Sequence, residues 1–548
     1  MPGEDAGRVH AVLNHRDACR WATLCVALGS GLILITIART SLTFDEPYFY
    51  TYGQRIVFDG HFARTDPIDD SKLPVSALNV LPEWAARHSH VPLASAQQIL
   101  GRWWSPREAA YLNAHLPIYA GRLVTIGFYV ALCWLAFVWG EELYGPAGAL
   151  AATALIGFLP MVLGHAALVT VDVAASCTMF AAVYALAHSL LRPSARRAVI
   201  AGLALGLAQL VKYTAIELVA VAPALLALRV VLPDPGWSRR RRLRTGIVSL
   251  VLSAAVALVI VNVGFAFQGS GVRLNDLACD SHGFQVLRHA IGRWWIPLPY
   301  EYLNGLDQVL KDDQEIGTPV YLMGEVSHSG FPWYYAVATA LKTPLPFLAL
   351  LLVRPWRRHR QFHDLVLVVP VAVLFVHLSF FFRTQIGLRY FLPAFPFLAL
   401  LAAGNWERAR APRWRAAATG LLSVTVAAVA LQCPHYLAYF NALTGSQLNA
   451  HRYLADSNLD WGQDLFALWA WEGAHAGESY ELEPYAPAHG VVIVRSDDFL
   501  GLRDPQAYRW LRASGAAPQS TIGSSYLLFN VPATGKASAR LAAGRMQD

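Results

Sequence analysis

The sequence predicts an α-helical polytopic membrane protein, one that crosses a bilayer many times. Of its 548 residues, 55% are hydrophobic and only 15% are charged, whereas soluble domains carry roughly 25% charged residues. The apolar residues also fall in runs that approach the roughly 20 residues a helix needs to cross a bilayer. So few charged residues could not form the solvated surface of several soluble domains, which argues against a soluble protein. The high share of hydrophobic residues argues against intrinsic disorder.

Eleven apolar runs are candidate membrane spans. They lie near residues 21–43, 123–140, 147–163, 170–190, 198–211, 214–232, 246–267, 332–353, 365–382, 387–404 and 416–433. Lys212 and Glu217 interrupt the fifth and sixth runs, which as one helix would be near 50 Å long at about 1.5 Å per residue, so we expect two short spans. The first run is longer than the apolar part of a signal peptide and lacks an A-x-A cleavage site, so we interpret it as a retained anchor.

The distribution of arginines predicts the orientation. Four short connections between runs hold sixteen arginines, whereas the short connections on the other side hold only Lys212, Arg383 and Arg389. The positive-inside rule therefore places the arginine-rich connections and the N-terminus in the cytoplasm, with the protein in the inner membrane. The sixteen are Arg192, Arg196, Arg197, Arg239, Arg240, Arg241, Arg242, Arg244, Arg354, Arg357, Arg358, Arg360, Arg408, Arg410, Arg413 and Arg415.

Three large segments are then expected on the outer face: 44–122, 268–331 and the tail that follows the last run. Within the first, residues 46–58 and 106–116 mix aromatic and polar side chains as interfacial helices do. Secondary transporters often consist of two related halves, but no repeat relates the two halves of this chain.

The tail is expected to be a separate α/β domain. We divide the chain into a transmembrane domain, residues 1–433, and an outer domain, residues 434–548. Alternation and turn residues predict helices near 461–472 and 505–514 and strands at 490–495 and 525–531. The C-terminus is thus expected outside the cytoplasm.

Acidic residues occupy two junctions between a span and the outer face. Asp45 and Glu46 follow the first run, where a carboxylate in a partly desolvated cavity can act as a base. Asp172 enters the fourth run, where an acid is costly and therefore suggests function. The alternative is helix capping, because Asp45 precedes Pro47 and Thr170 precedes Asp172.

Basic residues at or near the same face are candidate ligands of a phosphate. Lys212, Lys342 and Arg389 each interrupt apolar sequence, and His165 lies at the junction of the third and fourth runs. Intramembrane cations beside acids can hold a phosphate or pyrophosphate group. The alternatives are internal ion pairs, for example Lys212 with Glu217, and snorkelling of the side chains to lipid headgroups.

Metal and nucleic-acid sites find little support. Residues 456–464 imitate a calcium loop at positions one, three and five, but lack glycine at position six and have Ala467 at position twelve. If this segment is helical, Asp456, Asp460 and Asp464 share one face. The six cysteines form neither a zinc motif nor a disulfide framework, and the basic residues form no single stripe for nucleic acid. A divalent cation held by Asp45 and Asp172 remains open.

Several motifs follow one another along the chain. They are Asp45-Glu46, Thr170-Val171-Asp172, a Gly-Leu-Ala-x-Gly-Leu-Ala pattern before Lys212, Trp333-Tyr334-Tyr335 before Lys342-Thr343-Pro344-Leu345-Pro346, Gly387-Leu388-Arg389-Tyr390-Phe391-Leu392-Pro393, and a tail with Asn441 and residues 456–464. Together they resemble the bacterial family 39 glycosyltransferases, relatives of the protein O-mannosyltransferases and of the lipid A aminoarabinose transferase, which share the GT-C fold. The resemblance extends from about residue 40 to residue 531.

The resemblance implies a transferase that uses a polyprenyl-phosphate sugar on the outer face of the membrane. It implies that Asp45 is catalytic, with Glu46 beside it, and that Asp172 supports the acceptor or a metal. It implies more loosely that Lys342 and Arg389 bind the lipid phosphate. From first principles, a phosphate leaves without needing a proton, so one carboxylate base and a cationic clamp are sufficient. We therefore expect an inverting enzyme, for which Asp45→Asn is severe and Glu46→Gln milder.

Two other functions remain open at this stage. One is an O-mannosyltransferase acting on exported protein, although the chain has no recognisable MIR module, which puts a protein acceptor in doubt. The other is a transporter or flippase of a lipid-linked sugar, which needs the cations but no base. The expected partners are the lipid-linked donor, a lipid, glycan or protein acceptor, and membrane lipids.

Overall fold

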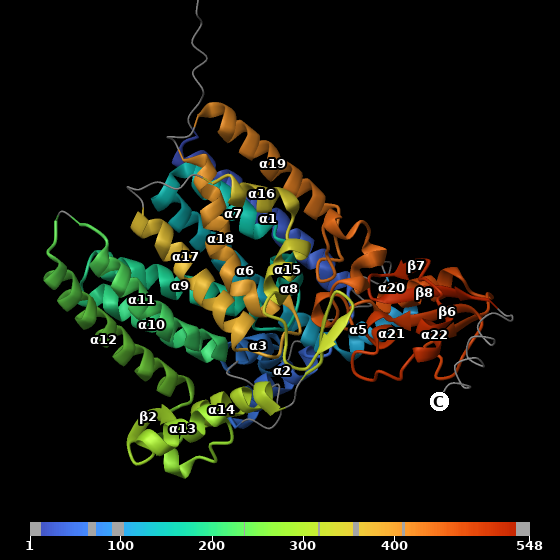
Figure 1. The fold of residues 1–548 in the computed structure, drawn as a ribbon, viewed down its shortest axis with the longest axis horizontal. Helices are drawn as coiled ribbons and strands as arrows, with labels where there is room; N and C mark the ends of the chain where they lie inside the picture. The colour runs from blue at the N-terminus through green and yellow to red at the C-terminus, as the bar shows by residue number, and fades with distance from the viewer. Residues whose placement is uncertain are drawn as a thin grey trace, which may run out of the picture.

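The computed structural model describes residues 13–63, 73–89, 104–234, 236–315, 318–354, 361–407 and 411–532. A bundle of long helices forms most of it, and a small mixed sheet lies against one side (Figure 1). The predicted fold class, a helical polytopic membrane protein with a small α/β tail, is confirmed. Some predicted cytoplasmic arginines lie outside the described residues: Arg357, Arg358, Arg360, Arg408 and Arg410.

All eleven apolar runs are occupied by helices. The helices are α1 (His15–Arg39), α6 (Leu116–Tyr144), α7 (Pro146–Gly157) with α8 (Pro160–Ala166), α9 (Asp172–Leu191), α10 (Ala195–Val211), η2 (Tyr213–Glu217) with α11 (Leu218–Val231), α12 (Arg239–Gly264), α15 (Tyr334–Lys342) with α16 (Leu345–Leu352), α17 (Gln361–Phe380), η5 (Leu388–Ala394) with α18 (Phe395–Ala403) and η6 (Gly404–Trp406), and α19 (Pro412–Ala430). The predicted break in the run 198–232 is confirmed, because α10 ends at Val211 and Lys212 is extended.

The number of spans differs from the predicted eleven. Among the described residues, seven helices are long and apolar enough to cross a membrane, and two bent pairs raise the number to nine. The pair α7 and α8 is bent by 61° and the pair α15 and α16 by 115°. α10 has only 17 residues and α19 begins with the polar sequence Pro-Arg-Trp-Arg, so neither matches the apolar length of a full crossing.

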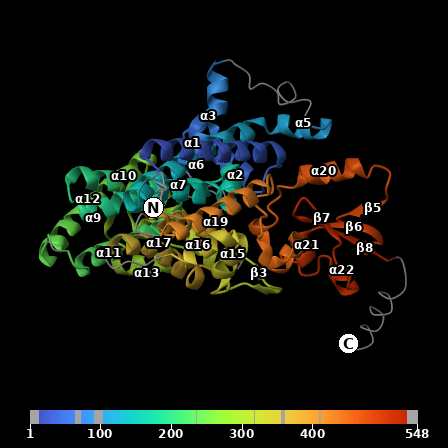
Figure 2. The ribbon, with the colours of Figure 1, turned by 90° about the horizontal axis from the view of Figure 1, so that it is seen from above.

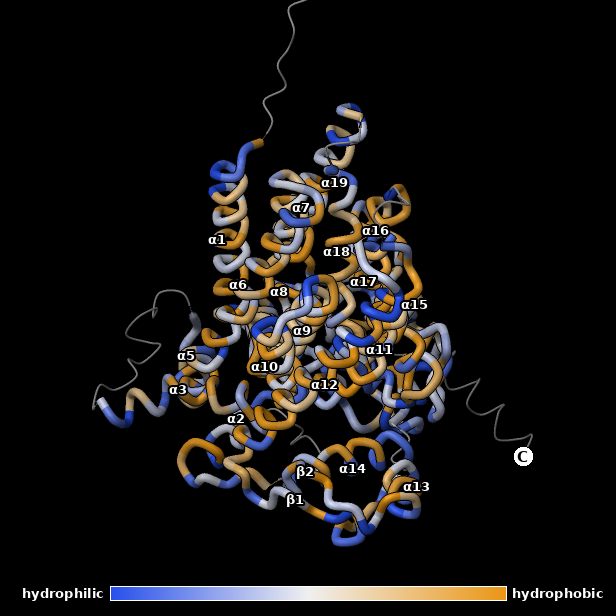
Figure 3. The backbone as a smooth tube through the Cα atoms, turned by 90° about the vertical axis from the view of Figure 1, so that its left-hand side faces the viewer, coloured by the Kyte–Doolittle hydropathy of each residue, from blue (hydrophilic) through white to orange (hydrophobic). Residues whose placement is uncertain are grey.

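The long helices run between two ends of the bundle. Figure 3 shows the polar first turns of α1 near α19 at one end, while the connection after α12 lies at the other end. This connection contains β1 (Ser270–Arg273), η3 (Leu274–Asp276), α13 (His282–Ile291), β2 (Trp295–Pro299) and α14 (Tyr300–Glu315), followed by β3 (Val320–Leu322) and β4 (Glu325–Ser327). The segment 268–331 therefore gathers at the end opposite the start of α1, as predicted.

Short helices cover the same end as this connection. α2 (Glu46–Gln54) continues into a π-helical turn, η1 (Arg55–Asp59), and is followed by α3 (Leu73–Ser89) and α5 (Pro106–Ala114). Ser105 starts α5 with a capping box in which its side chain accepts from the backbone of Glu108 and the Glu108 side chain accepts in return. α2 with η1 occupies the first predicted interfacial range, 46–58, and α5 occupies the second, 106–116.

The tail combines irregular segments, short helices and one sheet. It contains η7 (Ala442–Thr444), η8 (Gln447–Arg452), η9 (Asp456–Asn458), α20 (Leu465–Ala474), β5 (Tyr480–Leu482), β6 (Gly490–Arg495), α21 (Ser496–Leu500), α22 (Arg509–Ser514), β7 (Ser520–Ile522) and β8 (Tyr526–Val531). The sheet order is β5-β6-β8-β7, with β5 parallel to β6 and the other pairs antiparallel. Figure 2 shows the sheet beside the bundle, with α20 next to α5, where Arg107 and Glu472 form an ion pair of 2.8 Å.

The centre of the bundle is formed by α9 and by the segment from η5 to η6. Of the apolar stretch in each, 78% and 89% of the residues are buried inside the protein, against 28% for α1 and α12. α1 and α12 are therefore peripheral and expose apolar side chains as lipid-facing helices do. Asp172 and Arg389 lie at the beginning of the two central segments, so both groups are in the interior of the bundle, at the end opposite the start of α1.

Candidate active site

A cavity of about 300 Å³ opens where the end of α1 meets the tail. Its walls come from the α1–α2 connection, the segment before β3, the start of η5, and the tail. The lining residues are Phe44, Asp45, Thr318, Pro319, Ile386, Arg389, Asp456, Asp460, Trp461, Leu502 and Arg503. Three carboxylates and two guanidinium groups therefore surround one small chamber, and the tail supplies about half of its wall.

Asp45 lies at the rim of this cavity. It occupies the position before α2 but its side chain makes no capping hydrogen bond. Oδ2 instead accepts from Nη1 of Arg389 at 2.9 Å, and 18% of the Asp45 side chain is exposed. The capping alternative for this carboxylate is not what the structure adopts. Asp45 is available to a molecule in the cavity.

Arg389 links Asp45 to an aromatic platform. Its guanidinium carbon lies 4.2 Å from the centre of the Trp461 ring, and the side chain is nearly buried. Its Nε is buried and has no hydrogen-bond partner among the described residues. A guanidinium that is oriented by a ring and one carboxylate, with a donor unused, is suited to bind an anionic oxygen.

Asp172, His165 and Lys212 form a second, enclosed layer behind the cavity. Oδ1 of Asp172 accepts from Nζ of Lys212 at 2.8 Å, and Oδ2 lies 3.2 Å from Nδ1 of His165. The His165 ring packs on the other side of the layer against Trp461, with 5.6 Å between ring centres. Trp461 therefore contacts both Arg389 and His165, and it connects the two layers.

The sequence-based pairing of Lys212 with Glu217 is wrong. Glu217 accepts instead from His377, with Nδ1 2.8 Å from Oε1. Lys212 turns toward Asp172 because α10 ends one residue earlier and Lys212 adopts an extended backbone. Its ammonium also lies 4.6 Å from the Tyr390 ring centre.

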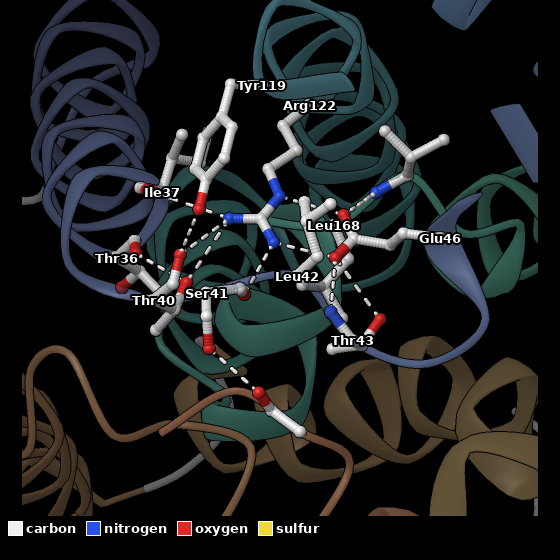
Figure 4. Close-up of polar contacts among 12 residues, drawn as sticks. Thr36, Ile37, Thr40, Ser41, Leu42, Thr43, Glu46, Tyr119, Arg122 and Leu168 are labelled. Carbon is white, nitrogen blue, oxygen red and sulfur yellow. Dashed lines mark hydrogen bonds and ion pairs between the residues drawn. The ribbon is translucent and has the colours of Figure 1, made fainter. Parts of the chain in front are cut away.

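Glu46 points away from the cavity into the protein. Its carboxylate receives Nε of Arg122 at 2.8 Å and Nη2 at 2.6 Å, and both side chains are fully buried (Figure 4). The backbone N–H groups of Thr43 and Val169 also donate to it, at 2.8 and 2.9 Å. This carboxylate is saturated with donors, so the arrangement does not support the catalytic role expected for it.

Arg122 ties the ends of three segments together. Besides Glu46, it donates to the carbonyl oxygens of Thr40 at 3.1 Å and Ser41 at 2.8 Å (Figure 4). The pair therefore joins the end of α1, the start of α2 and α6, and it orients the connection that carries Asp45. Sequence reasoning missed Arg122, although an arginine at the start of an apolar run was a visible signal.

Lys342 also makes a structural contact. Its buried Nζ donates to the carbonyl oxygen of Leu437 at 2.8 Å and to that of Asn458. Both acceptors belong to the tail, so Lys342 fastens the tail to α15. The arrangement does not place its ammonium in the cavity, where a phosphate ligand is expected.

The tail contributes acids whose ionisation is suppressed. Burial raises the pKa of Asp456 to about 6, although Arg389 and Arg503 oppose the shift. Burial also raises the pKa of Asp460, which accepts two hydrogen bonds from Arg495 at 2.8 and 2.9 Å. Burial and the neighbouring acids raise the pKa of Asp497 well above its usual range.

The acids of residues 456–464 do not share one helix face. Only Asp456–Asn458 forms a short 3₁₀ turn, and Asp464 accepts instead from the backbone of Ser524 and Ser525, at 2.8 and 3.0 Å. Within the described ranges, no group of three or more His, Cys, Asp or Glu side chains is placed to hold a metal ion. Asp45 and Asp172 therefore belong to no such group.

Comparison with protein families gives one match. Residues 110–265 match the family model described as dolichyl-phosphate-mannose-protein mannosyltransferase. The glycosyltransferase resemblance predicted from the sequence is confirmed. The matched region includes Arg122, which pairs with Glu46, and the three residues of the layer behind the cavity, His165, Asp172 and Lys212. No curated protein matches the chain.

Three solved structures are similar in fold to this chain. ArnT from Cupriavidus metallidurans bound to undecaprenyl phosphate is 17% identical, with a TM-score of 0.48 over 79% of this chain and 68% of that one. The apo state of the same protein is 16% identical, with a TM-score of 0.41 over the same shares. An oligosaccharyltransferase from Archaeoglobus fulgidus with a tethered acceptor peptide is 13% identical, with a TM-score of 0.42 over 75% and 55% of the two chains.

Proposed function

We propose that this protein transfers a sugar from a polyprenyl-phosphate donor to an acceptor on the outer face of the cytoplasmic membrane, with inversion and with Asp45 as the base. The observation that carries the proposal is the position of Asp45 at a small cavity, beside the guanidinium of Arg389. The description of the matching family supports a polyprenyl-phosphate sugar as the class of donor.

The proposed chemistry assigns one role to each of these two groups. Asp45 accepts the proton of the acceptor hydroxyl or amine as that atom attacks the anomeric carbon of the sugar. The bond between this carbon and the phosphate oxygen breaks, and the lipid phosphate leaves with the electron pair. Arg389 stabilises the leaving phosphate through donors that Asp45 does not occupy.

Asp172, Lys212 and His165 act by positioning under this proposal. Asp172 holds the side chains of Lys212 and His165 in place, and His165 packs on Trp461, which in turn supports the guanidinium of Arg389. A change in this layer should alter the binding of the donor through Arg389. Lys212 is placed to raise the local positive potential without contacting the cavity.

The tail is proposed to form the acceptor side of the site. It lines the cavity with Asp456, Trp461, Leu502 and Arg503, and Lys342 holds the tail against α15. A carboxylic acid and an arginine on the acceptor side favour a polar acceptor that can form hydrogen bonds with both. We propose an outer tail domain, residues 434–548, on this basis.

Transfer from a synthetic polyprenyl-phosphate mannose by the purified full chain in detergent tests the proposal. The assay compares wild type with Asp45→Asn and with Arg389→Lys, and donor binding is measured in parallel. We expect Asp45→Asn to bind donor and to lose at least about a hundredfold in transfer rate, as a missing base does. Movement of the donor across the bilayer of vesicles that contain the wild-type protein, without any transfer, would instead identify a flippase.

The identity of the acceptor separates this proposal from the protein O-mannosyltransferase alternative. Cell-envelope glycolipids, glycans and exported proteins from a deletion strain and its complemented control can be compared by mass spectrometry. A loss of hexose from exported proteins alone would favour the protein acceptor named in the family description.

A further inference from the structure

A larger cavity, of about 810 Å³, lies at the arginine-rich end of the bundle, between the starts of α10 and α12. It shares no residue with the candidate active site. The lining residues are Pro193, Ser194, Ala195, Ala198, Ser238, Arg240, Arg241, Arg244, Thr245, Val248, Ser249 and Leu252. This cavity has no role in the mechanism proposed above.

The cavity results from the way the two helices pair. α10 and α12 run side by side in the same direction (Figure 1), and a Cβ atom on Gly202 would lie 2.5 Å from the carbonyl oxygen of Ser253. Ser253 also donates to the carbonyl oxygen of Ala198 at 2.9 Å. The first residues of α10 therefore lie beside residues near 250 of α12. About ten residues of α12, or about 15 Å, extend beyond the start of α10.

The extension of α12 carries three arginines that line the cavity. Arg240 and Arg244 are one turn apart on this face, and the guanidinium of Arg241 lies 4.0 Å from the centre of the Trp237 ring. Within the part of the chain that the structure describes, these three form no ion pair with a carboxylate. No carboxylate of the described residues therefore compensates their charges.

Neighbouring arginines differ in this respect. Arg229 pairs with Asp234 at 2.5 Å, and Arg242 donates to the carbonyl oxygen of Arg229 at 2.9 Å and to that of Leu232. Those two buried arginines hold the α11–α12 connection in place. The exposed arginines of the cavity make no such contacts, so the fold does not require them there.

The beginning of α10 adds donors to the same cavity. Ser194 precedes α10 and its side chain accepts from the backbone of Arg197 at 3.3 Å, whereas the N–H groups of Ala195 and Arg196, as in the first turn of any helix, have no intrahelical acceptor. The positive end of the helix dipole therefore points toward the space that the arginines surround. The combination is complementary to a phosphate.

The remainder of the wall is apolar and continues onto the lipid-facing surface. Val248 and Leu252 line the cavity, and 62% of the Val248 side chain is exposed. Leu243, Ile247 and Val251 continue this exposed apolar surface along α12. A free inorganic phosphate would gain nothing from such a wall, whereas the acyl chains of a lipid would cover it.

We propose that this cavity binds an anionic phospholipid from the leaflet at the arginine-rich end. The lipid phosphate contacts Arg240 and Arg244 near the start of α10, and the acyl chains lie along the apolar face of α12. Each basic residue near an anionic lipid surface contributes on the order of a fivefold gain in affinity. Loss of both arginines should therefore weaken binding by about tenfold or more.

Titration of the purified full chain with phosphatidylglycerol, followed by native mass spectrometry, tests this proposal. The variant is Arg240→Gln with Arg244→Gln. The matched control is Arg16→Gln with Arg239→Gln, which removes two exposed arginines from the same end outside the cavity. We expect an increase in Kd of at least about tenfold for the variant and less than twofold for the control, since none of these side chains is buried.

Three results would overturn the proposal. An equal loss in the control would mean that the total positive charge attracts the lipid and no site exists. Equal binding of phosphatidylcholine would remove the role of the negative headgroup. Displacement of phosphatidylglycerol by millimolar inorganic phosphate would identify a site for a free anion in place of a lipid.

Discussion

Neutralisation of Glu46 should destabilise the protein, because it leaves Arg122 charged in the interior. In Glu46→Gln, an amide NH₂ must replace one carboxylate oxygen. It then faces two donors, which are Nη2 of Arg122 and the Thr43 N–H at one position, or Nε of Arg122 and the Val169 N–H at the other. Removal of one partner of a buried ion pair typically costs about 3 to 5 kcal/mol. Arg122 keeps the carbonyl oxygens of Thr40 and Ser41 as acceptors, so we expect about 3 kcal/mol.

The assay is thermal unfolding of the purified protein in detergent. For a chain of 548 residues, a loss of about 3 kcal/mol should lower the unfolding midpoint by about 3 °C. The matched control is Glu472→Gln, whose partner Arg107 has a side chain that is 62% exposed. Exposed pairs contribute about 0 to 1 kcal/mol, so this control should change the midpoint by no more than about 1 °C.

A double variant, Glu46→Gln with Arg122→Met, completes a thermodynamic cycle. If the cost arises from an unpaired charge, the double variant should lose less than the sum of the two single variants. A Glu46→Gln protein as stable as the Glu472→Gln control would refute the reasoning. It would show that the carboxylate of Glu46 is not needed to balance the charge of Arg122.

Four further outcomes are expected. Asp45→Asn should lower the transfer rate at least about a hundredfold at equal protein levels, because the variant no longer offers a basic oxygen; equal transfer rates would remove the base assignment. The pKa of Asp456 is about 6 in the folded protein, above its value near 4 in an unfolded chain, so stability should fall as pH rises from about 4 to about 6, and Asp456→Asn should reduce this fall in unfolding scans; an unchanged pH profile would contradict the shift. Lys342→Met should loosen the tail and increase its cleavage in limited proteolysis severalfold, because two carbonyl oxygens lose their donor; wild-type resistance would contradict this. A reporter active only outside the cytoplasm and fused after Asp548 should be active, and a silent fusion would show that the assumed parity of spans is wrong.

The sequence alone determined the class of the protein and the location of its helices. Hydropathy is a local property, so each apolar run was sufficient by itself to predict an apolar helix. The break at Lys212 and the strand Gly490–Arg495 were predictable for the same reason, because a charge in an apolar run and an alternating pattern act over a few residues. The number of crossings was not, because the bend of 115° between α15 and α16 depends on what packs around it.

Only the tertiary structure decided which acid could act. Asp45 and Glu46 are adjacent and chemically alike, and either could have faced the outside. Their partners come from distant parts of the chain: Arg389 lies 344 residues from Asp45, and Arg122 lies 76 residues from Glu46. A buried carboxylate takes the cation that packing brings to it, and packing across such separations leaves no local pattern. The sequence therefore indicated the junction, and the fold assigned one acid to the cavity and the other to the framework that supports it.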